Sequence, residues 1–145
     1  MIQPATEADL PEIDAIERVS FPAPWPIETF AGELKREWAH IDVLRVDGQL
    51  VAFNNYWIVT TELHILAIAT HPDHRGHGYG FQLLDYALRR AAAAGCALAT
   101  LEVRRSNVAA IALYERCGFK TVHVRARYYQ DNSEDALVML RGLSG

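Results

Sequence analysis

The feature that most restricts how this chain can fold is a glycine-rich segment between an apolar run and a long amphipathic pattern. Residues 62–70 are almost wholly apolar, three glycines fall between Gly76 and Gly80, and apolar side chains then recur at helical spacing until Gly95. We therefore predict a buried strand leading directly into a helix whose first N–H groups are uncovered and carry positive partial charge. Such a turn suits a phosphate group, but glycines also serve simply as tight turns, so both interpretations stay open.

The rest of the chain predicts alternating strands and helices. Before the glycine-rich segment we expect helices at 7–19 and 27–36, a stiff proline-rich loop at 21–25, and strands at 40–46, 50–59 and 62–70. After it we expect a helix from Gly76 to Gly95, a strand at 97–103, a helix capped by Ser106-Asn107 and ending near Cys117, and strands at 119–128 and 136–140. This order predicts an α+β domain with a right-handed central crossover.

Length and composition favour one enclosed core. The 145 residues are 50% hydrophobic and 22% charged, which suits a single domain over residues 1–145. No apolar run approaches the length of a membrane helix, and the first residues lack the pattern of a signal peptide. Cys96 and Cys117 form neither a disulfide framework nor a zinc site. We therefore expect a cytoplasmic protein that does not associate with membranes.

Charge is unevenly distributed along the chain. Residues 1–73 carry 4 basic and 12 acidic side chains, whereas residues 74–145 carry 10 basic and 6 acidic ones. This asymmetry is either chance or suits a polyanionic ligand on one side and a cationic substrate on the other. Scattered basic residues and a pI near 5.8 argue against a nucleic-acid partner.

Histidines and cysteines offer two further chemistries, which we set aside. His71, His74 and His77 recur every three residues, but a glycine-rich turn does not fix their directions as a helix would, so we expect no metal. Cys96 and Cys117 each lie beside a helix end, where the dipole opposes a thiolate, so a covalent cysteine intermediate is not expected.

The glycine-rich segment carries a resemblance to a known family. The pattern Arg75-x-x-Gly78-x-Gly80 resembles the acetyl-CoA signature of the Gcn5-related N-acetyltransferases (GNAT) and is neither a P-loop nor a Rossmann fingerprint. Four further blocks, in the right order over essentially the full chain, resemble the RimI-type ribosomal-protein-alanine N-acetyltransferases. They are Phe21-Pro22-x-Pro24-Trp25, Leu101 to Asn107, Ala110 to Phe119, and Tyr128-Tyr129 with Glu134 to Ala136. One departure is Gly76, where the signature often has a basic residue, so the phosphates would have one cation fewer.

The resemblance implies a GNAT fold, a mixed central sheet whose middle strands splay apart, flanked by about four helices. It also implies acetyl-CoA as cosubstrate, lying in the split between residues 62–70 and 97–103. The residues that it assigns to acetyl-CoA are Ile68, Thr70, Arg75, Gly76, His77, Gly78, Tyr79, Gly80 and Asn107.

Two catalytic residues follow from the same resemblance. It makes Glu102 a general base, directly or through water, and Tyr114 a general acid. Glu102 is the only acid in an otherwise apolar strand, although it could instead lie on a solvent face and pair with Arg104. Tyr114 shares a helix face with Asn107, which directs it toward the split; the alternative is a core tyrosine bonded to a backbone carbonyl.

The expected acceptor is the N-terminal α-amino group of a protein, by resemblance the N-terminal alanine of a small-subunit ribosomal protein. At neutral pH an α-amine is neutral far more often than lysine, because its pKa is about 7.8 rather than about 10.4. Trp25, Tyr128 and Tyr129 are the candidate acceptor-binding residues, and acids such as Glu28 and Glu33 could attract a basic peptide. A lysine or small-molecule acceptor and a catalytically silent CoA-binding subunit are the alternatives, and the oligomeric state stays open.

Overall fold

Seven strands form one mixed sheet in the order β1-β2-β3-β4-β5-β7-β6 in the computed structural model, which describes residues 1–143. The strands are β1 (Ile2–Pro4), β2 (Ala39–Val46), β3 (Gln49–Val59), β4 (Glu62–Thr70), β5 (Leu98–Arg104), β6 (Lys120–Arg125) and β7 (Ala136–Gly142). The helices are α1 (Leu10–Ser20), α2 (Ile27–Glu33), α3 (Tyr79–Ala93) and α4 (Val108–Arg116), with short 3-10 helices η1 (Glu7–Asp9) and η2 (Pro72–His74). The predicted α+β class is confirmed.

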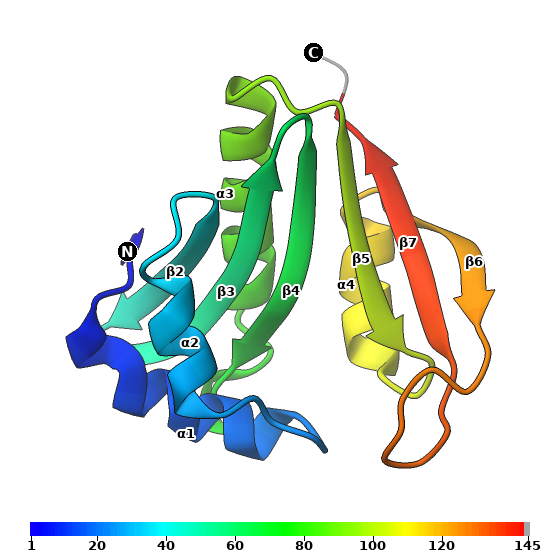
Figure 1. Cartoon of the computed structure of the whole chain (residues 1–145). Coiled ribbons are helices and arrows are strands. Elements are labelled where there is room, and N and C mark those ends of the chain that lie inside the picture. Colours follow the sequence, from blue (N-terminus) through cyan, green and yellow to red (C-terminus); the bar gives the residue numbers. More distant parts are fainter. Residues whose placement is uncertain (144–145) are drawn as a thin grey trace.

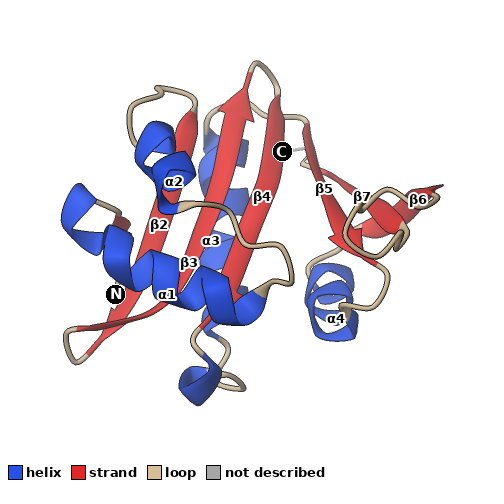
Figure 2. Cartoon of the chain, turned by 60° about the horizontal axis from the view of Figure 1, so that its bottom comes forward, coloured by secondary structure: helices blue, strands red, loops and turns tan. Residues whose placement is uncertain are grey.

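Helices cover both faces of the first half of the sheet and one face of the second. Figures 1 and 2 show α1 and α2 on one side of β2 to β4, α3 on the other, and α4 beside β5 and β7. The apolar stripe of α1 packs with Phe53 of β3, whereas that of α3 packs with Tyr56 and with residues of β5. The two halves therefore share one core behind the sheet, while the front of β5 and β7 carries no described helix.

The sheet opens between its two central strands. β4 and β5 run parallel and pair only along Glu62–Ile65 and Leu98–Leu101, after which they diverge, as Figure 1 shows. On the other edge of β4, Ala67 pairs with Asn55 and Ile65 with Tyr56, so Leu66 is an extra, bulged residue. Backbone groups beyond the bulge face the gap without a partner strand and are left to bond a ligand or water. The splayed sheet implied by the resemblance is thus confirmed.

Element boundaries differ from the predictions at several ends. α3 begins at Tyr79 rather than Gly76, because Gly76 and Gly78 have positive φ angles that a right-handed helix does not allow. α2 ends at Glu33 rather than residue 36, since the chain turns there through the bond from Lys35 N to Gly32 O. β1 was not predicted. Within residues 1–143, no helix is long and apolar enough to cross a membrane.

Candidate active site

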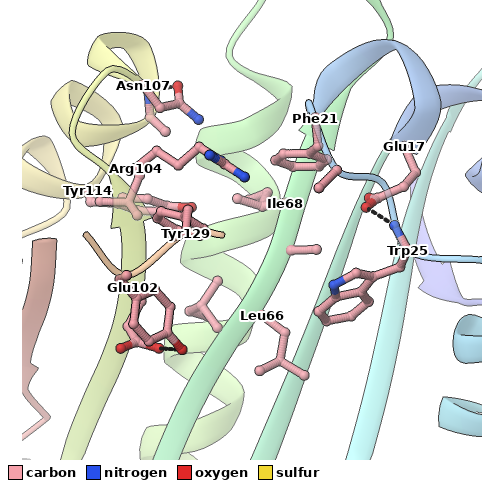
Figure 3. A pocket seen from close by; sticks show the side chains of 16 residues that line it. Glu17, Phe21, Trp25, Leu66, Ile68, Glu102, Arg104, Asn107, Tyr114 and Tyr129 are labelled. Atoms are coloured by element: carbon pink, nitrogen blue, oxygen red, sulfur yellow. Dashed lines mark hydrogen bonds between the residues drawn. The ribbon is translucent and has the colours of Figure 1, made fainter. Parts of the chain in front are cut away.

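The split between β4 and β5 contains two adjoining cavities. The first, of about 330 Å³, lies between the α1–α2 loop and β5, and we call it the β5 cavity (Figure 3). The second, of about 360 Å³, lies at the glycine-rich loop before α3, and we call it the glycine-loop cavity. The residues that line both are Phe21, Ile68, Asn107 and Ala110. Both volumes fall in the range of ordinary small-molecule sites.

The glycine-loop cavity is built to receive an anion. Gly78, the N-cap of α3, adopts the left-handed conformation with φ of +79°, and no side chain caps the helix. The first turn of α3 has no acid, and none lines this cavity within residues 1–143, whereas His74, Arg75 and Arg116 do line it. The uncovered N–H groups and the helix dipole therefore fit a diphosphate such as that of coenzyme A.

Most of the residues expected to contact the cosubstrate line this cavity. They are Ile68, Thr70, Arg75, Gly76, Gly78, Tyr79, Gly80 and Asn107. His77 does not line the glycine-loop cavity; its side chain is exposed and packs against the Tyr79 ring, with 5.7 Å between the ring centroids. A Cβ at Gly80 would lie 3.4 Å from Leu113 Cδ2, an ordinary van der Waals contact, so the packing of α3 on α4 does not by itself require glycine there.

Two arginines at the glycine-loop cavity have different roles. Arg75 donates from Nε to the Thr70 carbonyl oxygen at 3.0 Å and from Nη2 to Ser20 at 3.3 Å, so its side chain ties the loop to β4 and α1. Arg116 instead holds its guanidinium 4.6 Å from the centre of the Phe81 ring. Arg116 was not predicted from the sequence, although a cation in the last turn of α4 was a visible signal.

Asn107 links the two cavities. Its side-chain oxygen accepts a hydrogen bond from Ala110 N at 3.2 Å and thereby caps α4, which confirms the predicted cap. Figure 3 shows the amide group at the upper end of the β5 cavity. Because the oxygen is engaged by the cap, the amide nitrogen is the group left to contact a ligand.

Glu102 lies on the open face of β5 and not among apolar side chains. The prediction of apolar surroundings is therefore wrong, and the solvent-facing alternative is the one observed. Its neighbours Leu101 and Val103 point to the core, because side chains alternate along a strand. The carboxylate is 34% exposed, pairs with Arg125 Nε at 2.7 Å, and accepts a hydrogen bond from the Tyr128 hydroxyl at 3.3 Å. The partner is thus Arg125 rather than Arg104.

Tyr114 reaches the β5 cavity from α4, on the same face as Asn107 and Ala110 as predicted. The side chain is buried, and its hydroxyl makes no hydrogen bond within residues 1–143, so no backbone carbonyl engages it. Burial, with a smaller effect of the neighbouring Tyr129, raises the pKa of Tyr114. The hydroxyl therefore stays protonated and is available as a hydrogen-bond donor.

The β6–β7 loop, residues 126–135, forms one wall of the β5 cavity. Arg104 fixes this loop through Asp131 at 3.0 Å and stacks on the Tyr129 ring at 3.9 Å. Glu134 accepts a hydrogen bond from Ser106 N at 2.6 Å. Burial raises the pKa of Tyr129 to about 12, although Arg104 opposes the rise. Tyr128 and Tyr129 both line the cavity, as the acceptor-side prediction requires.

The α1–α2 loop forms the opposite wall. Trp25 lies across the cavity from Glu102 (Figure 3) and packs against Phe30 with ring centroids 5.6 Å apart. Glu33 cannot attract a peptide as expected, because its buried carboxylate accepts hydrogen bonds from Trp57 and Asn55. Glu17, which was not predicted from the sequence, is buried in this wall and accepts a hydrogen bond from the backbone N–H of Trp25 at 3.0 Å.

Within residues 1–143, no group of three or more histidine, cysteine or acidic side chains is placed to hold a metal ion. His71 accepts a hydrogen bond from Asp73 N at 3.1 Å and so stabilises the turn before the glycine-rich loop. Cys96 and Cys117 are free and buried, and burial raises the pKa of both thiols. Neither thiol is thus suited to nucleophilic attack.

Comparison with known proteins finds similar sequences and structures over most of the chain. Residues 10–119 match the model of the acetyltransferase (GNAT) family. The ribosomal protein bS18-alanine N-acetyltransferase of Escherichia coli (strain K12) is 36% identical over 138 residues, covering 94% of this chain and 93% of that protein. A protein of Bacillus subtilis (strain 168) described as a putative bS18-alanine N-acetyltransferase is 36% identical over 132 residues, covering 90% and 87%. The crystal structure of the Escherichia coli enzyme matches with a TM-score of 0.92 at 35% identity, covering 100% of this chain and 94% of that chain.

Proposed function

Because the chain belongs to the acetyltransferase (GNAT) family and is an acetyl-CoA-dependent N-acetyltransferase, we propose that it acetylates the N-terminal alanine of ribosomal protein bS18. The observation that carries this proposal is the pair of cavities that meet at the split in the sheet. One suits an anionic nucleotide, and the other presents a carboxylate and a protonated tyrosine to an incoming amine.

The glycine-loop cavity is the proposed seat of the cosubstrate, which supplies an acetyl group activated as a thioester. The N–H groups at the start of α3 would hold the diphosphate. Arg116 would supply the positive charge that is missing at position 76, where the family signature often has a basic residue. The unpaired edge of β4 beyond Leu66 would bind the arm that leads to the sulfur. Ile68 and Asn107 line both cavities and thus lie where the reacting groups would meet.

Glu102 is the proposed base. An α-amino group with a pKa near 7.8 is about 10% neutral at pH 7, so only a modest proton sink is needed. The attacking nitrogen forms a bond to the acetyl carbon and passes its extra proton to Glu102, through water. Arg125 and Tyr128 hold the two carboxylate oxygens and so fix the direction from which the proton is received.

Tyr114 is the proposed donor to the leaving group. As the carbon–sulfur bond breaks, the electron pair goes to sulfur, and the Tyr114 hydroxyl can donate a hydrogen bond to it. Complete proton transfer is unfavourable, because a thiol has a pKa of about 8.5 and burial raises the pKa of Tyr114. Stabilisation of the thiolate is therefore its main contribution.

The acceptor peptide is proposed to lie between Trp25 on one wall and Tyr128 and Tyr129 on the other. Rigid aromatic side chains bury large areas of a peptide at little cost in entropy. Both walls are fixed, one by Arg104 and one by Glu17, so the amino terminus would enter a preformed site.

Thiol release from acetyl-CoA tests the acceptor directly. We would compare a peptide copying the N-terminal segment of bS18, a lysine peptide with a blocked N-terminus, and a set of polyamines and aminoglycosides. Release with the first alone supports the proposal. Release with either of the others alone would show a different acceptor class, and no release with any would favour a silent CoA-binding subunit.

A further inference from the structure

Glu17 carries a buried charge that the reaction described above does not use. Only 2% of the residue is exposed, and it lines the β5 cavity beside Phe21 and Trp25. Its Oε2 accepts a hydrogen bond from the backbone N–H of Trp25 at 3.0 Å, whereas its Oε1 is buried without a hydrogen-bond partner within residues 1–143. Figure 3 shows Glu17 and Trp25 on the wall opposite Glu102.

The hydrogen bond between Glu17 and the backbone N–H of Trp25 anchors the loop at residues 22–25. Residues 22–25 precede α2 and contain Pro22 and Pro24, which have no N–H to donate. Within the described chain, the Trp25 N–H to Glu17 is the one hydrogen bond that joins residues 22–25 to another element. The position of the Trp25 wall therefore depends on this carboxylate.

The charges around the β5 cavity leave Glu17 without a cation. Glu102 pairs with Arg125, and Arg104 pairs with Asp131 of the β6–β7 loop. Glu17 has no ion pair with any arginine, lysine or histidine of residues 1–143. Burial and the neighbouring Asp14 raise the pKa of Glu17, and the backbone N–H of Trp25 partly offsets the rise. An unpaired buried carboxylate is costly, and an arriving ammonium group would compensate it.

We propose that Glu17 is a positioning residue for the acceptor, fixing the Trp25 wall through the Trp25 N–H and drawing the positively charged amino terminus of the peptide into the β5 cavity. This inference rests on the proposed function, because it requires an acceptor that arrives as a cation. About nine-tenths of an α-amine is protonated at pH 7, so the attraction acts on the species that binds first. The bound ammonium loses one proton to water before its nitrogen attacks, and Glu102 accepts, through water, the proton released on attack.

Steady-state kinetics with Glu17→Gln separate this role from a merely structural one. Glutamine keeps an oxygen for the backbone N–H of Trp25 but removes the charge, so we expect the KM for the bS18 peptide to rise about tenfold, the loss of one electrostatic attraction in a partly buried site. The KM for acetyl-CoA and the kcat at saturating peptide should stay near wild type. Glu17→Leu, which also releases the wall, should raise the peptide KM further. Glu37→Gln, an equal charge change at an exposed site, should change nothing.

A binding measurement on the CoA-loaded enzyme tests the charge itself. Wild type should bind the bS18 peptide with a free amino terminus more tightly than the same peptide with an acetylated one. Glu17→Gln should bind the two about equally. An unchanged peptide KM in Glu17→Gln, an undiminished preference for the free amine, or a rise in both KM values with a lower thermal midpoint would each overturn the proposal. Failure of wild type to acetylate the peptide would instead refute the proposed function.

Discussion

Replacing Tyr114 by phenylalanine removes one oxygen from the β5 cavity and little else. Because the hydroxyl makes no hydrogen bond within the described chain, its loss leaves no protein group unpaired, and the free energy of unfolding should change by less than about 1 kcal/mol. Loss of a preorganised donor to developing negative charge typically costs about 3 kcal/mol in the transition state. We therefore expect kcat to fall by a factor of about 150, with acetyl-CoA affinity unchanged.

Tyr56→Phe is the matched control, because Tyr56 is also buried but lies away from both cavities. Its hydroxyl donates to Asp42 at 2.6 Å and accepts from Arg90 at 3.3 Å. Removing the Tyr56 hydroxyl deprives the buried Asp42 carboxylate of a hydrogen-bond donor, which should lower the free energy of unfolding by about 2 kcal/mol. The control should therefore melt at a lower temperature and keep wild-type kcat.

The assay is the initial rate of thiol release at saturating peptide and acetyl-CoA, with calorimetry for coenzyme binding and thermal unfolding for stability. The two variants should show opposite outcomes: a catalytic loss without a stability loss for Tyr114→Phe, and the reverse for Tyr56→Phe. A Tyr114→Phe enzyme within about threefold of wild-type kcat would refute the role of the hydroxyl as donor to sulfur.

Three further substitutions test other parts of the site and fold. Gly78→Val should weaken acetyl-CoA binding at least about tenfold by calorimetry, whereas Gly48→Val, at a similar positive φ but outside the cavity lining, should not. Glu102→Gln should lower kcat/KM about a hundredfold at pH 7 and recover in part as rising pH deprotonates the acceptor; full activity at pH 7 would contradict a base role. Burial opposes ionisation of Asp9, but the Thr6 amide and Arg45 outweigh it and lower the pKa of Asp9. Asp9→Asn should thus lower the free energy of unfolding, measured with urea, by about 1 kcal/mol at pH 7. The difference from wild type should disappear as the pH falls below 3.8, because Asp9 is then protonated in both states.

Patterns that repeat locally predicted most of the fold. The alternation and apolar runs placed β2 to β5 within a residue or two, and Asn107 followed by an apolar stretch placed the start of α4. The bulge at Leu66 was not predictable in the same way, because β4 is apolar at nearly every position and shows no alternation that an extra residue could disturb. β1 has three residues and pairs only at the sheet edge, which is too short for any period.

The lining of the site was partly predictable, and its ion pairs were not. Positions on α4 followed from helical geometry, so Asn107 and Tyr114 were found to share the cavity wall. The partner of Glu102 does not follow from the strand register, which aligns Glu102 with Val138 of β7 and Val138 with His123 of β6. The ion pair forms instead with Arg125, two residues further along β6. Glu17 did leave a signal, because it falls four residues after Ile13 on the apolar stripe of α1, where an acid is out of place.

The two cavities share four residues, and α1, β4 and α4 contribute to both, but the β6–β7 loop lines only the β5 cavity and the turn at residues 70–80 lines only the glycine-loop cavity. Changes in the loops at 21–26 and 126–135 would alter which amines the enzyme selects, while the strand-to-helix turn at residues 70–80 would retain its nucleotide. Such independence lets evolution, or a protein engineer, redirect the enzyme to new acceptors without rebuilding its coenzyme seat.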